Sequence, residues 1–126
     1  MTGLPERLET VELVTTPDMA WAYGELTADH NPIHNDPEFA AGTPFGRPIA
    51  HGTMCLNLIL EAAERTFPGR EIGGLKVRFA RPMPVGERVR AVGVLSNAEA
   101  GAYEVAVELA DGTRAIEGVL NLGEAS

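Results

Sequence analysis

The segment from Gly52 to about Thr66 constrains the fold more than any other part of the chain. Its first turns offer almost no polar face, because they carry Met54, Cys55, Leu56, Leu58, Ile59 and Leu60. A helix that is apolar nearly all round is buried, and only the part from Glu61 onward is expected to meet solvent. We therefore predict one long helix that the rest of the chain encloses and that ends before Pro68.

Four segments after this helix alternate apolar and polar residues, which is typical of strands with one buried face. They are "GLKVRFARPM", "ERVRAVGVLS", "AYEVAVELA" and "TRAIEGVLNL". The pair Asp111-Gly112 between the last two is a strong hairpin signal, and short connections favour an antiparallel meander. We predict an α+β fold in which a strongly curved antiparallel sheet wraps the helix.

The N-terminal half predicts one strand, two short helices and an ordered loop. A first strand is expected within residues 7–15, and "TPDMAWAYGELTAD" opens with Pro17 and Asp18, which favour a helix start. In "NDPEFAAG", Asp36 is expected to cap a second helix and Gly42 to end it. The segment between these helices is expected to be neither helix nor strand, and "TPFGRPIAHG" reads as an ordered loop.

Composition excludes several classes of protein. The chain has 126 residues, 44% of them hydrophobic and 22% charged, so residues 1–126 are predicted to form a single globular domain. The formal net charge of −8 disfavours a nucleic-acid partner. The longest apolar stretch, "CLNLILEAA", is too short to span a bilayer. A thin two-layer fold of this size often gains stability by dimerising.

The single cysteine and the N-terminus bear on localisation. Cys55 has no cysteine partner within the chain, which is consistent with a reducing cytosol. Its apolar neighbours predict a buried side chain. The opening "MTGLPERLETVEL" has no apolar core of a signal peptide. We expect a cytoplasmic protein.

The segment "DHNPIHND", from Asp29 to Asp36, carries the candidate catalytic pair. Pro32 fixes its own φ and pushes Asn31 away from helical backbone, so the segment bends stiffly. The side chains of Asp29 and His34 can then face one cavity. A carboxylate and an imidazole that face one water can share its activation, and such proton transfer contributes about 10²–10⁴-fold.

Other interpretations of this segment stay open. Asp, Asn and Pro are also ordinary turn residues, and Asn31 can brace the loop by bonding to its backbone. Asp36 is expected to be a helix cap and not a catalytic group. We predict no metal site, because no familiar ligand spacing appears among Asp29, His30, His34 and His51.

Gly52 lies where the predicted buried helix begins. The amides of a first helical turn have no partner within the helix, and the helix dipole favours negative charge there. Glycine lets a ligand approach the backbone closely, so a thioester carbonyl placed there would be polarised. One such donor is worth about 10²–10³ in rate. The alternative is a plain glycine at a helix start, and His51 is expected to be a packed or hydrogen-bonded wall residue.

The segment "YGELTADHNPIHNDPEFAAGTPFGRPIAHG" resembles the MaoC-like dehydratases, also called R-specific enoyl-CoA hydratases. Their pattern runs roughly Gly-Asp-x-Asn-Pro-[Ile/Leu]-His-x-Asp, then Ala, then Phe-x-x-Pro-Ile-Ala-His-Gly. The matching residues are Asp29, Asn31, Pro32, Ile33, His34, Asp36, Ala40, Phe45, Pro48, Ile49, Ala50, His51 and Gly52. "VRFARPMPVGERV" resembles the strand-turn-strand that follows in that family. One departure is Ala28, where the family usually has glycine.

The resemblance implies a hot-dog fold, in which an antiparallel sheet wraps a long helix, and a homodimer with the acyl chain entering near the subunit interface. It implies that Asp29 and His34 hold the catalytic water and that the amide of Gly52 holds the thioester oxygen. The substrate-binding positions it implies are Asn31, Phe45, Pro48, Ile49, Ala50 and His51. The implied reaction belongs to fatty acid metabolism: syn addition of water to a trans-2-enoyl thioester, giving the (R)-3-hydroxyacyl product, or the reverse dehydration.

The chemistry of that reaction explains why these groups are needed. Conjugation with the thioester makes the β-carbon electrophilic, so water attacks there, while the α-carbon must take a proton. One site therefore needs a base, an acid and an oxyanion donor. Asp29, His34 and the amide of Gly52 supply all three without a metal or a redox cofactor. Coenzyme A or an acyl carrier protein would carry the acyl group.

Two rival functions remain. A hot-dog thioesterase often places a carboxylate on the central helix, but Glu61 and Glu64 come late in that helix and are expected to face solvent. A non-catalytic acyl-binding subunit of a heteromeric dehydratase would have no chemical need for the complete catalytic set. Lys76, Arg78 and Arg81 either meet phosphates of the carrier or form a solvated strand face.

Overall fold

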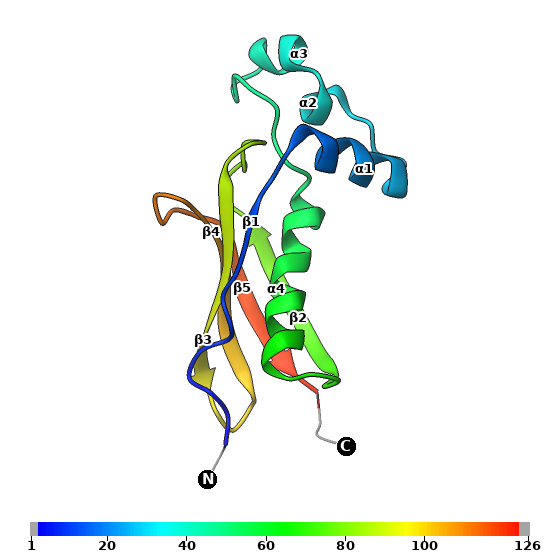
Figure 1. Cartoon of the computed structure of the whole chain (residues 1–126). Helices are drawn as coiled ribbons and strands as arrows, with labels where there is room; N and C mark the ends of the chain where they lie inside the picture. Colours follow the sequence, from blue (N-terminus) through cyan, green and yellow to red (C-terminus); the bar gives the residue numbers. More distant parts are fainter. Residues whose placement is uncertain (1–2, 124–126) are drawn as a thin grey trace.

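The structure is a computed structural model and describes residues 3–123. One five-stranded antiparallel sheet, in the order β1-β3-β4-β5-β2, carries the long helix α4 on one face, and three shorter helices gather beyond the N-terminal end of α4 (Figure 1). The elements in chain order are β1 (Val11–Val14), α1 (Pro17–Thr27), α2 (Pro32–Asn35), α3 (Pro37–Ala41), α4 (Gly52–Thr66), β2 (Ile72–Phe79), β3 (Arg88–Asn97), β4 (Ala102–Leu109) and β5 (Arg114–Leu122).

Helix α4 packs one side against the sheet. Its buried residues are Cys55, Leu58, Ile59, Ala62 and Ala63. They meet sheet residues that are fully buried, among them Tyr103, Val105 and Ile116. The prediction that α4 is enclosed on nearly all sides is wrong for one stripe, because Leu60 is 38% exposed. A sheet from one chain covers only one side of the helix, so apolar composition alone overstated the burial.

The strand predictions are confirmed, and the hairpin lies where Asp111-Gly112 placed it. Gly112 has a φ of +88°, which glycine adopts without strain. Asp111 Oδ1 accepts a hydrogen bond of 2.8 Å from the amide of Thr113. Because that bond favours the ionised carboxylate, it lowers the pKa of Asp111. No helix among residues 3–123 is long and apolar enough to cross a bilayer.

The short helices α2 and α3 begin at residues whose side chains cap the helix. Asp36 caps α3 as predicted, since its Oδ1 accepts from the amides of Glu38 at 3.0 Å and Phe39 at 3.2 Å. The prediction of no helix between α1 and α3 is wrong, because Pro32–Asn35 forms the short helix α2. Proline is preorganised for the first helical position, and Asn31 caps this turn by accepting from the amide of Ile33 at 3.0 Å.

Candidate active site

A cavity of about 360 Å³ lies at the N-terminal end of α4. It brings together two parts of the sequence: the segment from α2 to α4, and the segment that follows β2. Its lining residues are His34, Phe45, Ile49, Ala50, Gly52, Phe79, Ala80, Arg81, Pro82 and Met83. The imidazole of His34 and the first residue of α4 therefore border the same space.

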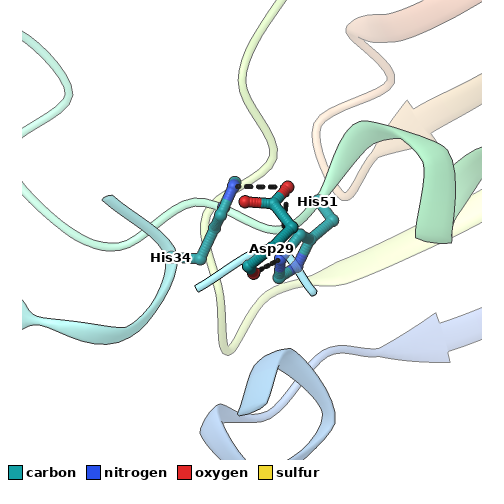
Figure 2. Close-up of side chains that lie close together, drawn as sticks. All are labelled: Asp29, His34 and His51. Atoms are coloured by element: carbon teal, nitrogen blue, oxygen red, sulfur yellow. Dashed lines mark hydrogen bonds and ion pairs between the residues drawn. The ribbon is translucent and has the colours of Figure 1, made fainter. Parts of the chain in front are cut away.

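Asp29 and His34 face each other across a short gap at this cavity (Figure 2). The distance from His34 Nε2 to Asp29 Oδ2 is 3.9 Å, which is too long for a direct hydrogen bond but suits one bridging water. The His34 side chain is 13% exposed and that of Asp29 is 51% exposed. Both groups are therefore open to a water or substrate.

A backbone carbonyl sets the tautomer of His34. Its Nδ1 lies 2.7 Å from the carbonyl oxygen of Ile49, and a carbonyl only accepts, so the hydrogen sits on Nδ1. In the neutral ring, Nε2 is then the unprotonated nitrogen, and it points toward Asp29. The ring is thus oriented for proton transfer at Nε2.

His51 contacts both Asp29 and His34. It is 2% exposed, and its Nε2 donates a 3.1 Å hydrogen bond to the backbone oxygen of Asp29. Its ring stacks on that of His34, with centroids 3.8 Å apart and an interplanar angle of 23°. The ring of Tyr23 also packs against His51, with the two ring centroids 4.9 Å apart. The structure therefore places His51 as a packed, hydrogen-bonded residue outside the cavity lining.

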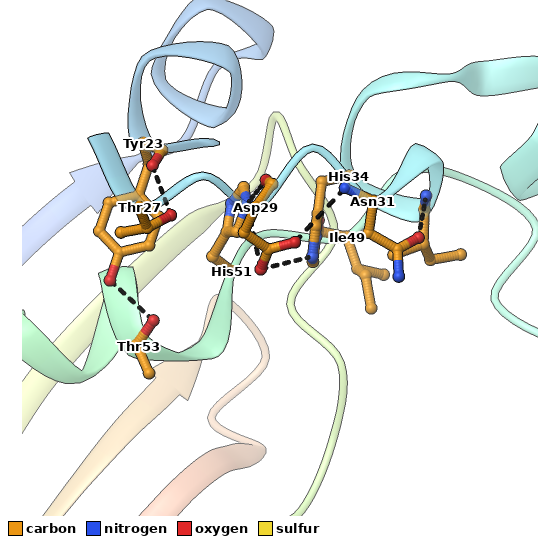
Figure 3. Close-up of polar contacts among 9 residues, drawn as sticks. Tyr23, Thr27, Asp29, Asn31, His34, Ile49, His51 and Thr53 are labelled. Carbon is orange, nitrogen blue, oxygen red and sulfur yellow. Dashed lines mark hydrogen bonds and ion pairs between the residues drawn. The ribbon is translucent and has the colours of Figure 1, made fainter. Parts of the chain in front are cut away.

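Further polar contacts surround Asp29 and His34 (Figure 3). Tyr23 donates a 2.7 Å hydrogen bond to Oγ1 of Thr53, which ties α1 to the first turn of α4. The amide of Asn31 lies 3.4 Å from Oδ1 of Asp29. Asn31 and Pro48, which were predicted to bind substrate, lie outside the cavity lining. Tyr23 and Thr53 were missed by the sequence analysis, because only their spatial approach distinguishes them from ordinary helix residues.

Gly52 presents the start of α4 to the cavity. Helix α4 has no side-chain hydrogen bond at its N-cap, so its first amides are not occupied by a capping side chain. A Cβ on Gly52 would lie 2.8 Å from Cε1 of Phe79, so glycine lets the Phe79 ring lie close to the helix start. Phe79 and Met83 are cavity residues that the sequence analysis did not select, and Arg81, which it considered for the phosphates of the carrier, also lines the cavity. They belong to "FARPM", the end of the predicted strand segment "GLKVRFARPM", of which the observed strand β2 keeps only the part up to Phe79.

Asp29, His34 and His51 are the one compact set of possible metal ligands among residues 3–123, with one ligand atom from each within 4.8 Å of the others. His30 does not join them, since it lies 3.5 Å from Glu25 instead. Nε2 of His51 donates to a carbonyl, so it offers no lone pair in that state. Of the two Nε2 atoms that approach Asp29, only that of His34 then carries a lone pair, because the lone pair of His51 is on its buried Nδ1. One imidazole nitrogen and one carboxylate are fewer than the three protein ligands usual for zinc.

Ala28 ends α1 in the left-handed conformation, with φ 56° and ψ 35°. The structure thus has positive φ at Ala28, the position where the pattern that the chain resembles usually has glycine. Glycine at position 24 allows the chain to turn back closely after α1, because a Cβ there would come within 2.7 Å of the backbone oxygen of Asp29. The left-handed residue thus lies directly before Asp29 and sets the direction in which the chain leaves α1.

Replacing Ala28 with Gly is expected to raise the free energy of unfolding by up to about 0.5 kcal/mol. Glycine relieves the left-handed strain, which is about 1 kcal/mol. This gain exceeds the free-energy cost that arises because glycine gives the unfolded chain more conformational entropy. Ala22→Gly is the matched control, since this exposed residue lies within α1, where glycine should cost about 1 kcal/mol. Urea unfolding of both variants measures the difference, and equal destabilisation by the two would contradict the strain.

Comparison with known proteins identifies relatives of the chain. A protein-family model described as "MaoC like domain" matches residues 4–115. The chain is 47% identical over 83 residues to 3-hydroxyacyl-thioester dehydratase Z of Mycobacterium tuberculosis, a match that covers 61% of this chain and 55% of that protein. It is 39% identical over 72 residues to the (R)-specific enoyl-CoA hydratase of Aeromonas caviae, covering 56% and 54% respectively. The chain thus spans about half the length of these curated relatives.

The fold is also similar to a solved structure, the (R)-hydratase from A. caviae involved in PHA biosynthesis. The TM-score is 0.85, and the match covers 97% of this chain and 96% of that one. Sequence identity in this match is 24%, so the likeness speaks for the fold. The predicted α+β hot-dog architecture is confirmed.

Proposed function

Because the chain belongs to the MaoC-like domain family, we propose that it is a hydro-lyase that adds water to a trans-2-enoyl thioester, giving the (R)-3-hydroxyacyl thioester, or catalyses the reverse dehydration. One observation carries this proposal above the others. His34 and Gly52 border a single cavity, and Asp29 reaches to 3.9 Å from Nε2 of His34. His34 and the proposed amide donor thus border one space, and Asp29 adjoins that space beside Nε2 of His34.

The proposed step uses the chain's own groups. Asp29 and His34 hold the water, and the amide of Gly52 donates to the thioester oxygen. The oxygen of the water attacks the β-carbon while one proton passes to the Asp29–His34 pair, and the negative charge moves to the thioester oxygen, where the amide stabilises it. The pair then returns a proton to the α-carbon. Water and enoyl thioester sum to the product, so no metal or redox cofactor enters the step.

The other predicted site residues divide into two groups in this proposal. Phe45, Ile49 and Ala50 line the cavity and would contact the acyl chain. His51 and Asn31 would act through the catalytic loop: His51 by its bond to the backbone oxygen of Asp29, and Asn31 by capping α2. Pro48 would likewise act as part of the loop.

We further propose that the protein works as a homodimer in the cytoplasm, in fatty acid metabolism, with residues 1–126 forming one domain. The exposed Leu60 of α4 and the sheet edge β2, whose one neighbour in the described sheet is β5, support a second copy there. Light scattering should give twice the mass of one chain. The mass of one chain would instead favour a partner of different sequence, as in a heteromeric dehydratase.

The activity is tested with crotonyl-CoA, by following loss of the conjugated enoyl absorbance while a thiol reagent reports free coenzyme A. Hydration without thiol release supports the hydratase, and thiol release supports a thioesterase. The absence of both signals would favour a non-catalytic subunit. Glu61 gives a thioesterase no support, since it pairs with Arg65 at 3.1 Å, away from the cavity.

The thiol signal should come from coenzyme A alone. Burial raises the pKa of Cys55 to about 11, and its side chain is 0% exposed, so the protein's own thiol is expected to be silent at pH 8. Since the folded state disfavours the thiolate, stability should be full below about pH 9 and fall as the pH rises toward 11. Urea unfolding between pH 8 and 11 measures this, and a Cys55→Ala variant without that slope is the control.

A further inference from the structure

A second cavity, of about 450 Å³, adjoins the candidate active site. The two cavities share the residues Phe79, Ala80 and Arg81, which follow or end β2. The lining of the second cavity is Arg78, Phe79, Ala80, Arg81, Thr113, Arg114 and Glu117. This neighbour of the catalytic pocket is therefore polar and rich in arginine.

The charges that line this second cavity do not balance. Arg78 pairs with Glu117. Arg81 and Arg114 make no ion pair within 4.0 Å among the described residues. Asp111 feels the charge of Arg81, but it is held chiefly by Thr113. Two guanidinium groups are thus left to bind an external anion.

Another surface cavity of this protein provides a contrast. It is about 110 Å³ in volume and is also lined by two arginines. There Arg90 lies 2.8 Å from Glu108, and Arg88 lies 3.9 Å from Glu12. Each arginine of that cavity has its own carboxylate, so the surplus of positive charge distinguishes the cavity beside the catalytic pocket from this one.

We propose that Arg81 and Arg114 bind the phosphate of the 4′-phosphopantetheine arm that carries the acyl thioester, an inference that rests on the proposed hydratase function. Guanidinium groups match phosphate oxygens in paired hydrogen bonds. With a net charge of −8, the protein as a whole repels an anionic carrier, so recognition requires a local positive site. Coenzyme A and an acyl carrier protein present this same phosphate.

The backbone connects the two cavities in the required order. Phe79 lies against Gly52, where the thioester oxygen would be held. The amides of Ala80 and Arg81 both donate to the carbonyl oxygen of Ala115, at 2.7 and 3.2 Å. This fixes Arg81 beside the start of β5 and hence beside Arg114. A carrier arm that leaves Gly52 along this segment arrives at the two arginines.

The test uses crotonyl thioesters of pantetheine, 4′-phosphopantetheine, coenzyme A and acyl carrier protein. In Arg81→Gln and Arg114→Gln we expect KM for the phosphopantetheine and coenzyme A thioesters to rise about tenfold, the size of a lost charge-assisted hydrogen bond. For Arg114→Gln, which changes a residue outside the candidate active-site cavity, the value of kcat/KM for the pantetheine thioester, which lacks the phosphate, should stay within about twofold. Arg88→Gln is the matched control, since this exposed arginine lines the balanced cavity.

The outcomes separate this inference from the function beneath it. Hydration of crotonyl-pantetheine by the unmodified protein tests the hydratase alone, and absence of any hydration overturns both. An equal loss with and without the phosphate, or no loss with coenzyme A, overturns the phosphate site and leaves the hydratase standing. A rise in KM of the arginine variants for every phosphorylated carrier supports binding of the shared phosphate. A rise in KM for the coenzyme A thioester without a rise for the phosphopantetheine thioester would mean that the arginines bind the nucleotide, against the proposal.

Discussion

Asp29→Asn and His34→Ala are each expected to lower the turnover of crotonyl-CoA by at least about a hundredfold, the usual size of proton-transfer catalysis. Asparagine keeps the size of Asp29 and can still accept from the amide of Asn31, but it cannot take a proton. Alanine at 34 removes the nitrogen that faces Asp29 at 3.9 Å. Both losses should appear in kcat, because the proposed role of the two groups is to act on the reacting water.

The control for this pair lies in the same loop. His30→Ala removes an imidazole that packs at a tilt against Trp21 and lies 3.5 Å from Glu25, outside the cavity. Its turnover should stay within a few-fold of the unmodified protein. Circular dichroism and thermal melting must show all three variants folded. If a folded Asp29→Asn or His34→Ala protein hydrates at nearly the unmodified rate, that residue has no part in the mechanism.

Gly118→Ala is expected to cost about 3 kcal/mol of unfolding free energy or more, a large value for one methyl group. Gly118 of β5 is paired with Val77 of β2. A Cβ there would overlap the backbone oxygen of Lys76 and come within 2.8 Å of the Cα of Val77. Backbone atoms cannot turn aside as a side chain can, so β2 would have to separate from β5.

A second glycine in the same strand pair isolates this effect. Gly74 of β2 has no atom within 4 Å of where its Cβ would lie. Gly74→Ala should therefore leave stability unchanged or raise it by up to about 1 kcal/mol, since alanine loses less entropy in a strand. Urea unfolding of the two variants measures the contrast. Equal stability of the two would mean that the β2–β5 pair tolerates a methyl group and that the predicted clash is relieved cheaply.

Several features could be predicted from the sequence because their causes are local. The apolar run after Gly52 makes a helix that must pack, the alternation after residue 72 makes strands, and Asp111-Gly112 makes the hairpin. Asp36 caps a helix because its carboxylate lies next to the amides it serves. The family pattern likewise identified Asp29, His34 and Gly52 as candidates, since a motif is a run of neighbouring residues.

Only the tertiary structure decided how groups distant in the chain meet. The bond from Nδ1 of His34 to the carbonyl of Ile49 spans 15 residues and sets which nitrogen faces Asp29. The approach of Arg81 to Arg114 depends on the pairing of β2 with β5, and the exposure of Leu60 depends on how far the sheet reaches around α4. Local sequence determines what a segment can form and which side must be covered. The partners are determined by packing across the whole chain, because burial and charge balance are sums over neighbours that the sequence order does not reveal.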